Sequence, residues 1–313
     1  MPKLKIALLS GGISGEREVS LNTGKQIYNA LSKEKYEIIQ YDPKTDLKQF
    51  FIDAMDRKFD LVFPALHGPY GEDGKLQGML DMIKMPYVFS GCLASALAMN
   101  KEKSKIIAKN AGLNIIPYEV IDKKQEFNII QIKNQLSLPI VIKPMELGSS
   151  VGMSIANNIQ ELEKGIEQAF KHDEYLMLEQ FIKGRELTVA VMGREKNTKA
   201  LPVIEIIPKI SSFFDYKAKY EVGGSDEICP AKIPDVTKDK IQALAIKVYQ
   251  AIGCKDLARA DFIWSNHDLK LYFLEINTIP GMTQTSLAPQ AAKVAGMEFS
   301  EFLDKLIESN IKS

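Results

Sequence analysis

The sequence has few cysteines and no excess of charge of either sign. Its 313 residues include only 3 cysteines, which cannot all pair, and no Cys-x-x-Cys motif. This argues against a disulfide framework or a thiolate zinc site and predicts a reducing, cytoplasmic environment. Because 40 basic side chains balance 40 acidic ones, electrostatics give no argument for a nucleic-acid or membrane partner.

Long apolar runs and the common nucleotide motifs are also missing. The most apolar stretch, residues 85–100, is interrupted by Pro86 and Gly91, and the run at 6–9 is too short for the core of a signal peptide. We therefore expect no membrane span and no secretion signal. Neither the phosphate-binding Gly-x-x-x-x-Gly-Lys-Ser/Thr motif nor Gly-x-Gly-x-x-Gly occurs, so any ATP must bind in another way.

Short apolar runs alternate with helical patterns in the first third of the chain. Strands are predicted at 5–9, 37–41 and 61–65, and helices at 19–31, 47–55 and 74–83. This alternation predicts a parallel sheet covered by helices, with ligands bound beyond the carboxyl ends of the strands. Two glycine-rich loops, at 11–20 and 67–74, fall at those ends.

The remaining two thirds predict further elements of both kinds. Helices are expected at 100–112, 159–170, 238–252 and 300–307, and strands at 140–143, 175–179, 187–192, 260–264 and 271–276. The tetrad at 265–268 is a good turn between the last two strands. The polar stretch at 209–232 is too long for a plain connection. It is predicted to form a lid, with a disordered segment as the alternative.

Three oxygen-donor side chains converge on the predicted hairpin. Glu275 and Asn277 are two residues apart on a strand, so they face the same side. A turn near Asp268 places Asp261 opposite Glu275. Without His or Cys, this set suits a hard cation such as Mg²⁺, and the Gly281 loop adds backbone amides beside it. The alternative is strand residues that alternate outward to solvent.

Two further segments have features of a nucleotide site. Lys143 ends a strand and precedes the small-residue loop at 148–152, whose amides and hydroxyls suit phosphate oxygens. The alternative is a flexible turn. The apolar strand at 176–179 leads into residues that could form a hinge for an adenine edge, and Glu186 follows for the ribose. A plain hairpin is the alternative there.

The two glycine-rich loops carry charged or titratable groups. Glu16 and Glu18 would repel phosphate, so they favour a cationic ligand such as an amino group; the alternative is that they favour the dipole of the following helix. His67 is one of 3 histidines and is predicted to be a functional loop residue, with a structural role in the loop as the alternative.

Together these segments resemble the D-alanine–D-alanine ligase family of the ATP-grasp superfamily. The resemblance lies in GGISGEREVS at 11–20, HGPYGEDG at 67–74, VIKP with GSSVG at 141–144 and 148–152, and LEINTIPGMT at 274–283. It implies an α/β fold, α+β in its ATP-grasp part, with three domains. These would cover 1–97, 98–184 and 185–313, the ATP-grasp region would cover about 101–308, and ATP would lie between the second and third domains.

The resemblance also implies an activity, the ATP-dependent ligation of two D-alanines for peptidoglycan through an acyl phosphate. It assigns the ATP phosphates to Lys101, Lys143 and Lys219, the adenine to Glu179, Phe181 and Ile182, and the ribose to Glu186. Two Mg²⁺ or Mn²⁺ ions would be bound by Asp261, Glu275 and Asn277. These ions neutralise charge, so that one anion can attack another.

For the amino acids, the resemblance assigns Glu16 and His67 to the first D-alanine. Further roles follow for the oxyanion (Arg259 and the Gly281 amide), for the second carboxylate (Ser286 and the Leu287 amide) and for a closing loop (Lys219 and Tyr220). Tyr220 would join Ser149 and Glu16 in a hydrogen-bonded triad. Closure would protect the acyl phosphate from water.

Some positions depart from the family pattern. Met145 and Leu147 stand where the loop is often polar, and Phe214 stands where tyrosine is common, which leaves the contacts of that loop open. A rival is a depsipeptide ligase that joins D-alanine to D-lactate, against which Tyr220 argues. A second rival is a nucleotide-binding regulatory module without turnover. A homodimer is expected from the resemblance alone.

Overall fold

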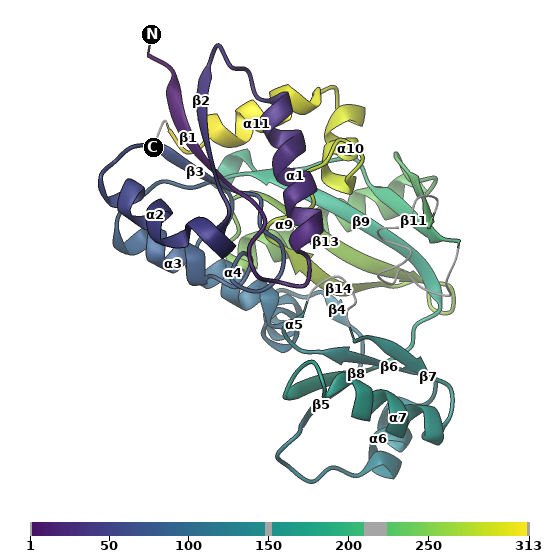
Figure 1. Cartoon of the computed structure of the whole chain (residues 1–313). Helices are drawn as coiled ribbons and strands as arrows, with labels where there is room; N and C mark the ends of the chain where they lie inside the picture. Colours follow the sequence, from purple (N-terminus) through teal and green to yellow (C-terminus); the bar gives the residue numbers. More distant parts are fainter. Residues whose placement is uncertain (1, 148–151, 210–223, 312–313) are drawn as a thin grey trace.

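The computed structural model describes residues 2–147, 152–209 and 224–311, and within these ranges the strands form three sheets (Figure 1). The first sheet is parallel, with the order β2-β1-β3, and consists of β1 (Leu4–Leu9), β2 (Tyr36–Tyr41) and β3 (Leu61–Pro64). The helices that alternate with these strands are α1 (Arg17–Ala30), α2 (Pro43–Met55) and α3 (Lys75–Met82). The predicted parallel sheet is therefore confirmed.

The second sheet is antiparallel and lies at the bottom of Figure 1. Its order is β5-β8-β6-β7, and its strands are β5 (Tyr118–Asp122), β8 (Tyr175–Gln180), β6 (Ile140–Pro144) and β7 (Ser154–Ala156). Helices α6 (Ile129–Leu136) and α7 (Ile159–Ala169) cover one face. Their apolar side chains and those of β6 and β8 form a separate core.

The third sheet has seven strands and carries the predicted metal hairpin. Its main path is β12 (Ser225–Ile228), β11 (Ile204–Pro208), β9 (Gly184–Gly193), β13 (Asp256–Ser265), β14 (Leu271–Asn277) and β4 (Asn114–Ile115). The short strand β10 (Lys199–Ala200) pairs with β9, and a 3₁₀ turn, η1 (Glu195–Asn197), precedes it. The predicted turn joins β13 to β14 in an antiparallel pair.

Helices pack on both faces of this third sheet. One face forms a core with α4 (Cys92–Met99), α5 (Lys101–Asn110) and α9 (Asp235–Ile252). The other face shares a core with the first sheet and with α10 (Leu287–Val294) and α11 (Phe299–Glu308). The first and third sheets are thus held together by apolar packing, and none of the described helices is long and apolar enough to cross a membrane.

The structure adds an unpredicted element to two segments, and in a third it decides between two predictions. The apolar stretch at 85–100 contains helix α4, and the polar stretch at 209–232 contains strand β12. The segment after β8 is not a plain hairpin, because β8 belongs to the second sheet and β9 to the third. Residues 181–183 therefore connect two sheets, in agreement with the predicted hinge.

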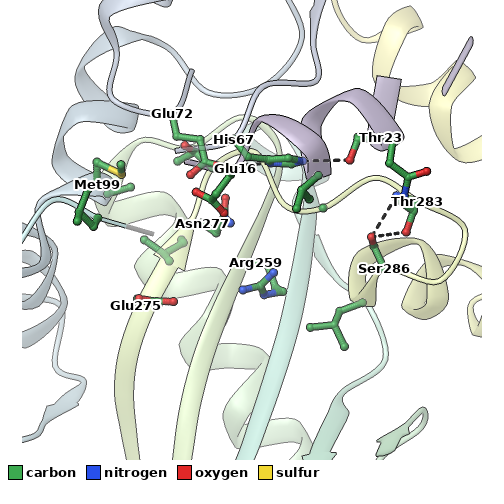
Figure 2. A pocket seen from close by; sticks show the side chains of 18 of the residues that line it. Glu16, Thr23, His67, Glu72, Met99, Arg259, Glu275, Asn277, Thr283 and Ser286 are labelled. Carbon is green, nitrogen blue, oxygen red and sulfur yellow. Dashed lines mark hydrogen bonds and ion pairs between the residues drawn. The ribbon is translucent and has the colours of Figure 1, made fainter. Parts of the chain in front are cut away.

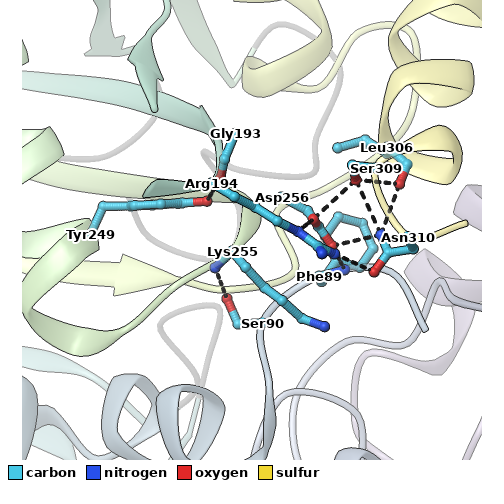
Figure 3. Close-up of polar contacts among 10 residues, drawn as sticks. All are labelled: Phe89, Ser90, Gly193, Arg194, Tyr249, Lys255, Asp256, Leu306, Ser309 and Asn310. Atoms are coloured by element: carbon cyan, nitrogen blue, oxygen red, sulfur yellow. Dashed lines mark hydrogen bonds and ion pairs between the residues drawn. The ribbon is translucent and has the colours of Figure 1, made fainter. Parts of the chain in front are cut away.

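A buried carboxylate joins the C-terminal residues to two distant segments of the chain (Figure 3). Asp256, at the start of β13, is 2% exposed. It accepts hydrogen bonds from the Phe89 amide at 2.9 Å and from Arg194 Nε at 2.7 Å. It also accepts bonds from Ser309 Oγ at 3.0 Å and Asn310 Nδ2 at 2.8 Å, directly after α11. The network links the segment between α3 and α4, the end of β9 and the C-terminal helix.

Candidate functional site

A cavity of about 500 Å³ brings together residues from those predicted substrate segments that the structure describes (Figure 2). The predicted residues that line it are Glu16, His67, Lys101, Arg259, Glu275, Asn277, Gly281, Ser286 and Leu287. They come from the loops after β1 and β3, from α5, from the β13–β14 hairpin and from the start of α10. Figure 2 shows Glu16 and His67 above the strands that carry Arg259 and Glu275.

One end of the cavity is built around Glu16 and His67. Both are buried, at 7% and 6% exposure. His67 Nε2 lies 3.1 Å from Thr23 Oγ1, and Nδ1 lies 3.4 Å from Glu72 Oε1. Burial raises the pKa of Glu72, while the neighbouring His67 opposes that shift. Two contacts of His67, to Thr23 and Glu72, were missed from the sequence, although Glu72 lies in the same motif.

Gly68 shows why the second loop needs a glycine. Its φ is +74°, and a Cβ there would lie 2.7 Å from Glu16 Oε2. Any other residue would be strained and would push against the Glu16 carboxylate. The Ser14 hydroxyl donates to the His67 carbonyl at 2.7 Å, so the two glycine-rich loops are also joined directly.

The hairpin pairs its residues as the sequence predicted. Asp261 lies opposite Glu275, and Arg259 opposite Asn277. Asp261 does not line the cavity. Its carboxylate accepts hydrogen bonds from Arg259 Nε at 2.9 Å, Arg259 Nη2 at 2.8 Å and Thr188 Oγ1 at 2.5 Å. The ion pair with Arg259 was missed, although residues two apart on a strand share a face.

The oxygen donors of the hairpin are of the chemical type that binds a hard cation. Two carboxylates and one amide, with no His or Cys, are ligands that suit Mg²⁺. Glu275 and Asn277 face the cavity, and the Asn277 side chain accepts from the Ile279 amide at 2.9 Å. Among the described residues, no group of three or more His, Cys, Asp or Glu side chains is arranged to hold a metal.

The predicted ATP residues divide between two places. Lys101 lines the cavity, and its Nζ donates to the carbonyls of Leu147 at 2.6 Å and Met145 at 3.3 Å. Those that do not line the cavity are Lys143, Glu179, Phe181, Ile182 and Glu186. Lys143 Nζ forms an ion pair with Glu179 Oε2 at 2.5 Å. Glu179 had been predicted only as part of the hinge.

The opposite end of the cavity contains hydroxyl groups and the start of a helix. Ser286 Oγ lies 2.8 Å from Thr283 Oγ1 and accepts from the Thr283 amide at 3.1 Å. A Cβ on Gly281 would lie 2.9 Å from Ser286 Oγ, so glycine allows the loop to pack there. Leu287 begins α10, and its amide is one that a helix leaves for a ligand.

Glu227 is a cavity residue that the sequence did not reveal. It lies on β12, inside the stretch that was predicted as a loop, and it lines the cavity. Gln290 donates a hydrogen bond to its carboxylate. Burial raises the pKa of Glu227, against the opposing effects of Gln290 and Arg259.

Some predictions fall on residues outside the described ranges. Ser149, Lys219 and Tyr220 lie in the two gaps of the description, so the predicted triad with Glu16 stays a prediction. The same holds for Phe214.

A parallel α/β unit, joined to two sheets that meet at a hinge and to a cavity with lysine and carboxylate groups, defines an enzyme of the ATP-grasp class. Residues 107–308 match the family model described as D-ala D-ala ligase C-terminus, and residues 40–92 match that of the N-terminus. The D-alanine–D-alanine ligase of Syntrophobacter fumaroxidans is 47% identical over 307 residues, which cover 98% of this chain and 97% of that protein. The chain belongs to the D-alanine–D-alanine ligase family.

Two solved structures show the same fold. A D-alanine–D-alanine ligase from Bacillus anthracis complexed with ATP is 31% identical, with a TM-score of 0.82 over 99% of this chain and 97% of that one. The VanG D-Ala:D-Ser ligase from Enterococcus faecalis is 32% identical, with a TM-score of 0.83 over 99% of this chain and 100% of that one.

Proposed function

We propose that this protein joins two D-alanines into D-alanyl-D-alanine with ATP, for peptidoglycan synthesis. The observation that carries the proposal is the cavity of the candidate site. It places a buried carboxylate for an ammonium group, an arginine, a glycine loop and a helix start around one space. Family membership supports the same activity, since the relatives carry the name D-alanine–D-alanine ligase at high coverage.

In the first half-reaction, Glu16 holds the ammonium group of the first D-alanine, with His67 beside it. The carboxylate of that D-alanine attacks the γ-phosphorus of ATP; the bond to ADP breaks and an acyl phosphate forms. Lys101 and Lys143, with Lys219, hold the phosphates. The hinge residues Glu179, Phe181 and Ile182 hold the adenine, and Glu186 holds the ribose. ATP as substrate is supported by the similar ATP-complexed ligase.

Two Mg²⁺ or Mn²⁺ ions would be held by Asp261, Glu275 and Asn277. Bound there, they would lower the repulsion between the attacking carboxylate and the triphosphate. The Arg259–Asp261 ion pair balances the Asp261 charge within the protein. Arg259 and Thr188 together therefore orient the Asp261 carboxylate.

In the second half-reaction, Ser286 and the Leu287 amide hold the carboxylate of the second D-alanine. Its amine, once it has lost a proton, attacks the acyl carbon, and the carbon–oxygen bond to phosphate breaks. Arg259 and the Gly281 amide stabilise the oxyanion that forms. The closing loop with Lys219 and Tyr220 excludes water from the acyl phosphate, and Tyr220 joins Ser149 and Glu16 in a hydrogen-bonded triad.

We propose the domain division 1–97, 98–184 and 185–313, in which the first sheet lies in the first part, the second sheet in the second part, and most of the third sheet in the third part. Helix α5 and strand β4, from the second part, pack on β14 of the third. This packing brings Lys101 to the cavity. The homodimer is a prediction that rests on the resemblance, and the cytoplasmic location is a prediction that rests on the low cysteine content.

The decisive experiment measures phosphate release from ATP by the purified protein with Mg²⁺ and D-alanine, D-serine or D-lactate as the second substrate. We expect D-alanine-dependent release and a D-alanyl-D-alanine product identified by mass spectrometry. Faster ester formation with D-lactate at neutral pH would replace the proposal with a depsipeptide ligase. Absence of any D-alanine-dependent release would favour a nucleotide-binding module without turnover.

A further inference from the structure

Lys105 is a fully buried lysine that the proposed chemistry does not use. It lies on α5, four residues after Lys101, and is 1% exposed. Burying an ammonium group is unfavourable unless it is paired and hydrogen-bonded. Its Nζ lies 2.7 Å from Glu179 Oε1 and donates to the Phe273 carbonyl at 3.3 Å. It is thus paired on both sides of the junction between the second and third sheets.

Glu179 is shared between two lysines. Its Oε1 pairs with Lys105, and its Oε2 lies 2.5 Å from Lys143 Nζ on the neighbouring strand β6. Glu179 is itself 1% exposed, so solvent screens none of these charges effectively. One carboxylate between two ammonium groups leaves a net charge of one positive unit on the cluster.

The directions of the pKa shifts in this cluster agree with an ionised Glu179 carboxylate. Burial disfavours the charged form of Glu179, but the two ammonium groups outweigh it and lower its pKa to about 2. Burial likewise opposes the charged form of Lys143, and Glu179 overcomes this and raises its pKa. For Lys105, burial lowers the pKa and Glu179 counteracts the shift.

The shared carboxylate makes the two lysines depend on each other. If Lys105 were lost, Glu179 would have Lys143 as its single lysine partner, and the pair would be neutral. The attraction between unit charges at such distances is large in a buried site. Lys143 already lies 2.5 Å from Glu179, so the loss would not move it closer; it would leave a pair without net charge, which attracts an approaching phosphate less.

We propose that Lys105 is a positioning residue for ATP: it neutralises Glu179, so that Lys143 keeps its positive charge for the nucleotide phosphates. The inference rests on the proposed function, in which Lys143 binds those phosphates. Lys105 also links α5 to the Phe273 carbonyl, two residues before Glu275. It therefore fixes the lysine side of the nucleotide site relative to the metal hairpin.

The test is a charge-balance cycle with Lys105→Met, Glu179→Gln and the double variant. Methionine keeps the volume of lysine without its charge. We measure the Kd for ATP with Mg²⁺ by calorimetry, and KM for ATP and for D-alanine in the phosphate-release assay. Lys105→Met should weaken ATP binding about tenfold or more, with KM for D-alanine nearly unchanged. The double variant should bind ATP more tightly than Lys105→Met. Glu179→Gln removes the negative charge that Lys105 no longer neutralises, so the positive charge of Lys143 again acts on the phosphates.

Lys109→Met is the matched control, since Lys109 is an exposed lysine on the same helix. It should bind ATP like the wild type. An unchanged Kd for ATP in Lys105→Met overturns the proposal. So do additive losses in the double variant, which would indicate a structural role. If Lys105→Met does not fold, the folded double variant decides, and its failure to bind ATP overturns the proposal.

The calorimetric measurement of ATP affinity tests this inference separately from the proposed function. A wild-type protein that binds ATP but releases no phosphate with D-alanine would contradict the ligase activity alone. The comparison of ATP affinities would still decide the role of Lys105.

Discussion

Glu275 is the single carboxylate whose charge the proposed reaction needs most. It lines the cavity and lies opposite Asp261 on the hairpin. Glu275→Gln keeps the size and one oxygen but removes the charge that would hold a divalent cation. We expect kcat to fall by about 10²-fold or more, since a metal ion supplies several kcal/mol of charge stabilisation. Steady-state phosphate release measures the effect.

The control for Glu275→Gln is Glu174→Gln, which removes an exposed carboxylate paired with Lys124 at the surface. Both variants should unfold near the wild-type temperature, because neither changes a packed apolar side chain. If Glu275→Gln keeps wild-type turnover, the hairpin is not the metal site.

At the scale of elements, the Asp42 side chain holds together strand β2, helix α2 and the glycine-rich loop before α1. It is the N-cap of α2 and accepts from the Lys44 amide at 3.0 Å. It accepts from the Gly12 amide at 2.9 Å, in the loop before α1. Arg17, the first residue of α1, donates to both carboxylate oxygens at 2.9 and 2.5 Å. One side chain thus joins β2, α2 and the glycine loop next to Glu16.

This arrangement predicts a pH-dependent contribution to stability. The hydrogen bonds from Arg17, with those of the Gly12 and Lys44 amides, lower the pKa of Asp42 from 3.8 to about 2, although burial opposes the shift. Because the folded state favours the charged form, the stabilisation is present above pH 4 and is lost as the pH falls towards 2. Asp42→Asn should cost about 1 kcal/mol at pH 7 after allowance for solvent screening.

Urea unfolding at pH 7 and at pH 3 and below checks this prediction. The difference between Asp42→Asn and wild type should shrink as the pH falls, whereas Asp239→Asn, an exposed carboxylate on α9, should show no such trend. A difference independent of pH would mean that Asn fails as a cap rather than as a charge.

Elements with a strong local period were predictable, and elements defined by distant partners were not. The first sheet and the β13–β14 hairpin follow from alternation and from one turn. Strands of two or three residues, such as β4 and β7, exist because a neighbouring strand supplies hydrogen bonds. A lysine in a helix is expected at the surface, so no local pattern indicates that Lys105 is buried. Its burial depends on Glu179, which lies far along the chain.

The same reason explains which parts of the candidate site were found. Glu275, Asn277 and the two glycine-rich loops are marked by local spacing. Glu227 reaches the cavity because β12 pairs with β11 at the edge of the third sheet, and no local pattern indicates that pairing.

At the scale of the whole molecule, the Asp256 network ties the C-terminal residues to the N-terminal part. Ser309 and Asn310 supply two of the hydrogen bonds to this buried carboxylate, and Arg194 Nη2 also donates to Asn310 Oδ1 at 2.5 Å (Figure 3). The network lies at the start of β13, the strand that carries Arg259. None of its residues lines the cavity.

We therefore expect Ser309→Ala/Asn310→Ala to lower stability without changing the chemistry. Loss of two donors leaves a buried carboxylate less satisfied, which costs about 1–3 kcal/mol. Urea unfolding should show this loss, and kcat well below the unfolding temperature should equal that of wild type. Asn266→Ala, an exposed residue in the β13–β14 turn, is the control. If the double variant unfolds like the control, Arg194 and the Phe89 amide satisfy Asp256 by themselves; if kcat falls while stability holds, the network positions β13 for catalysis.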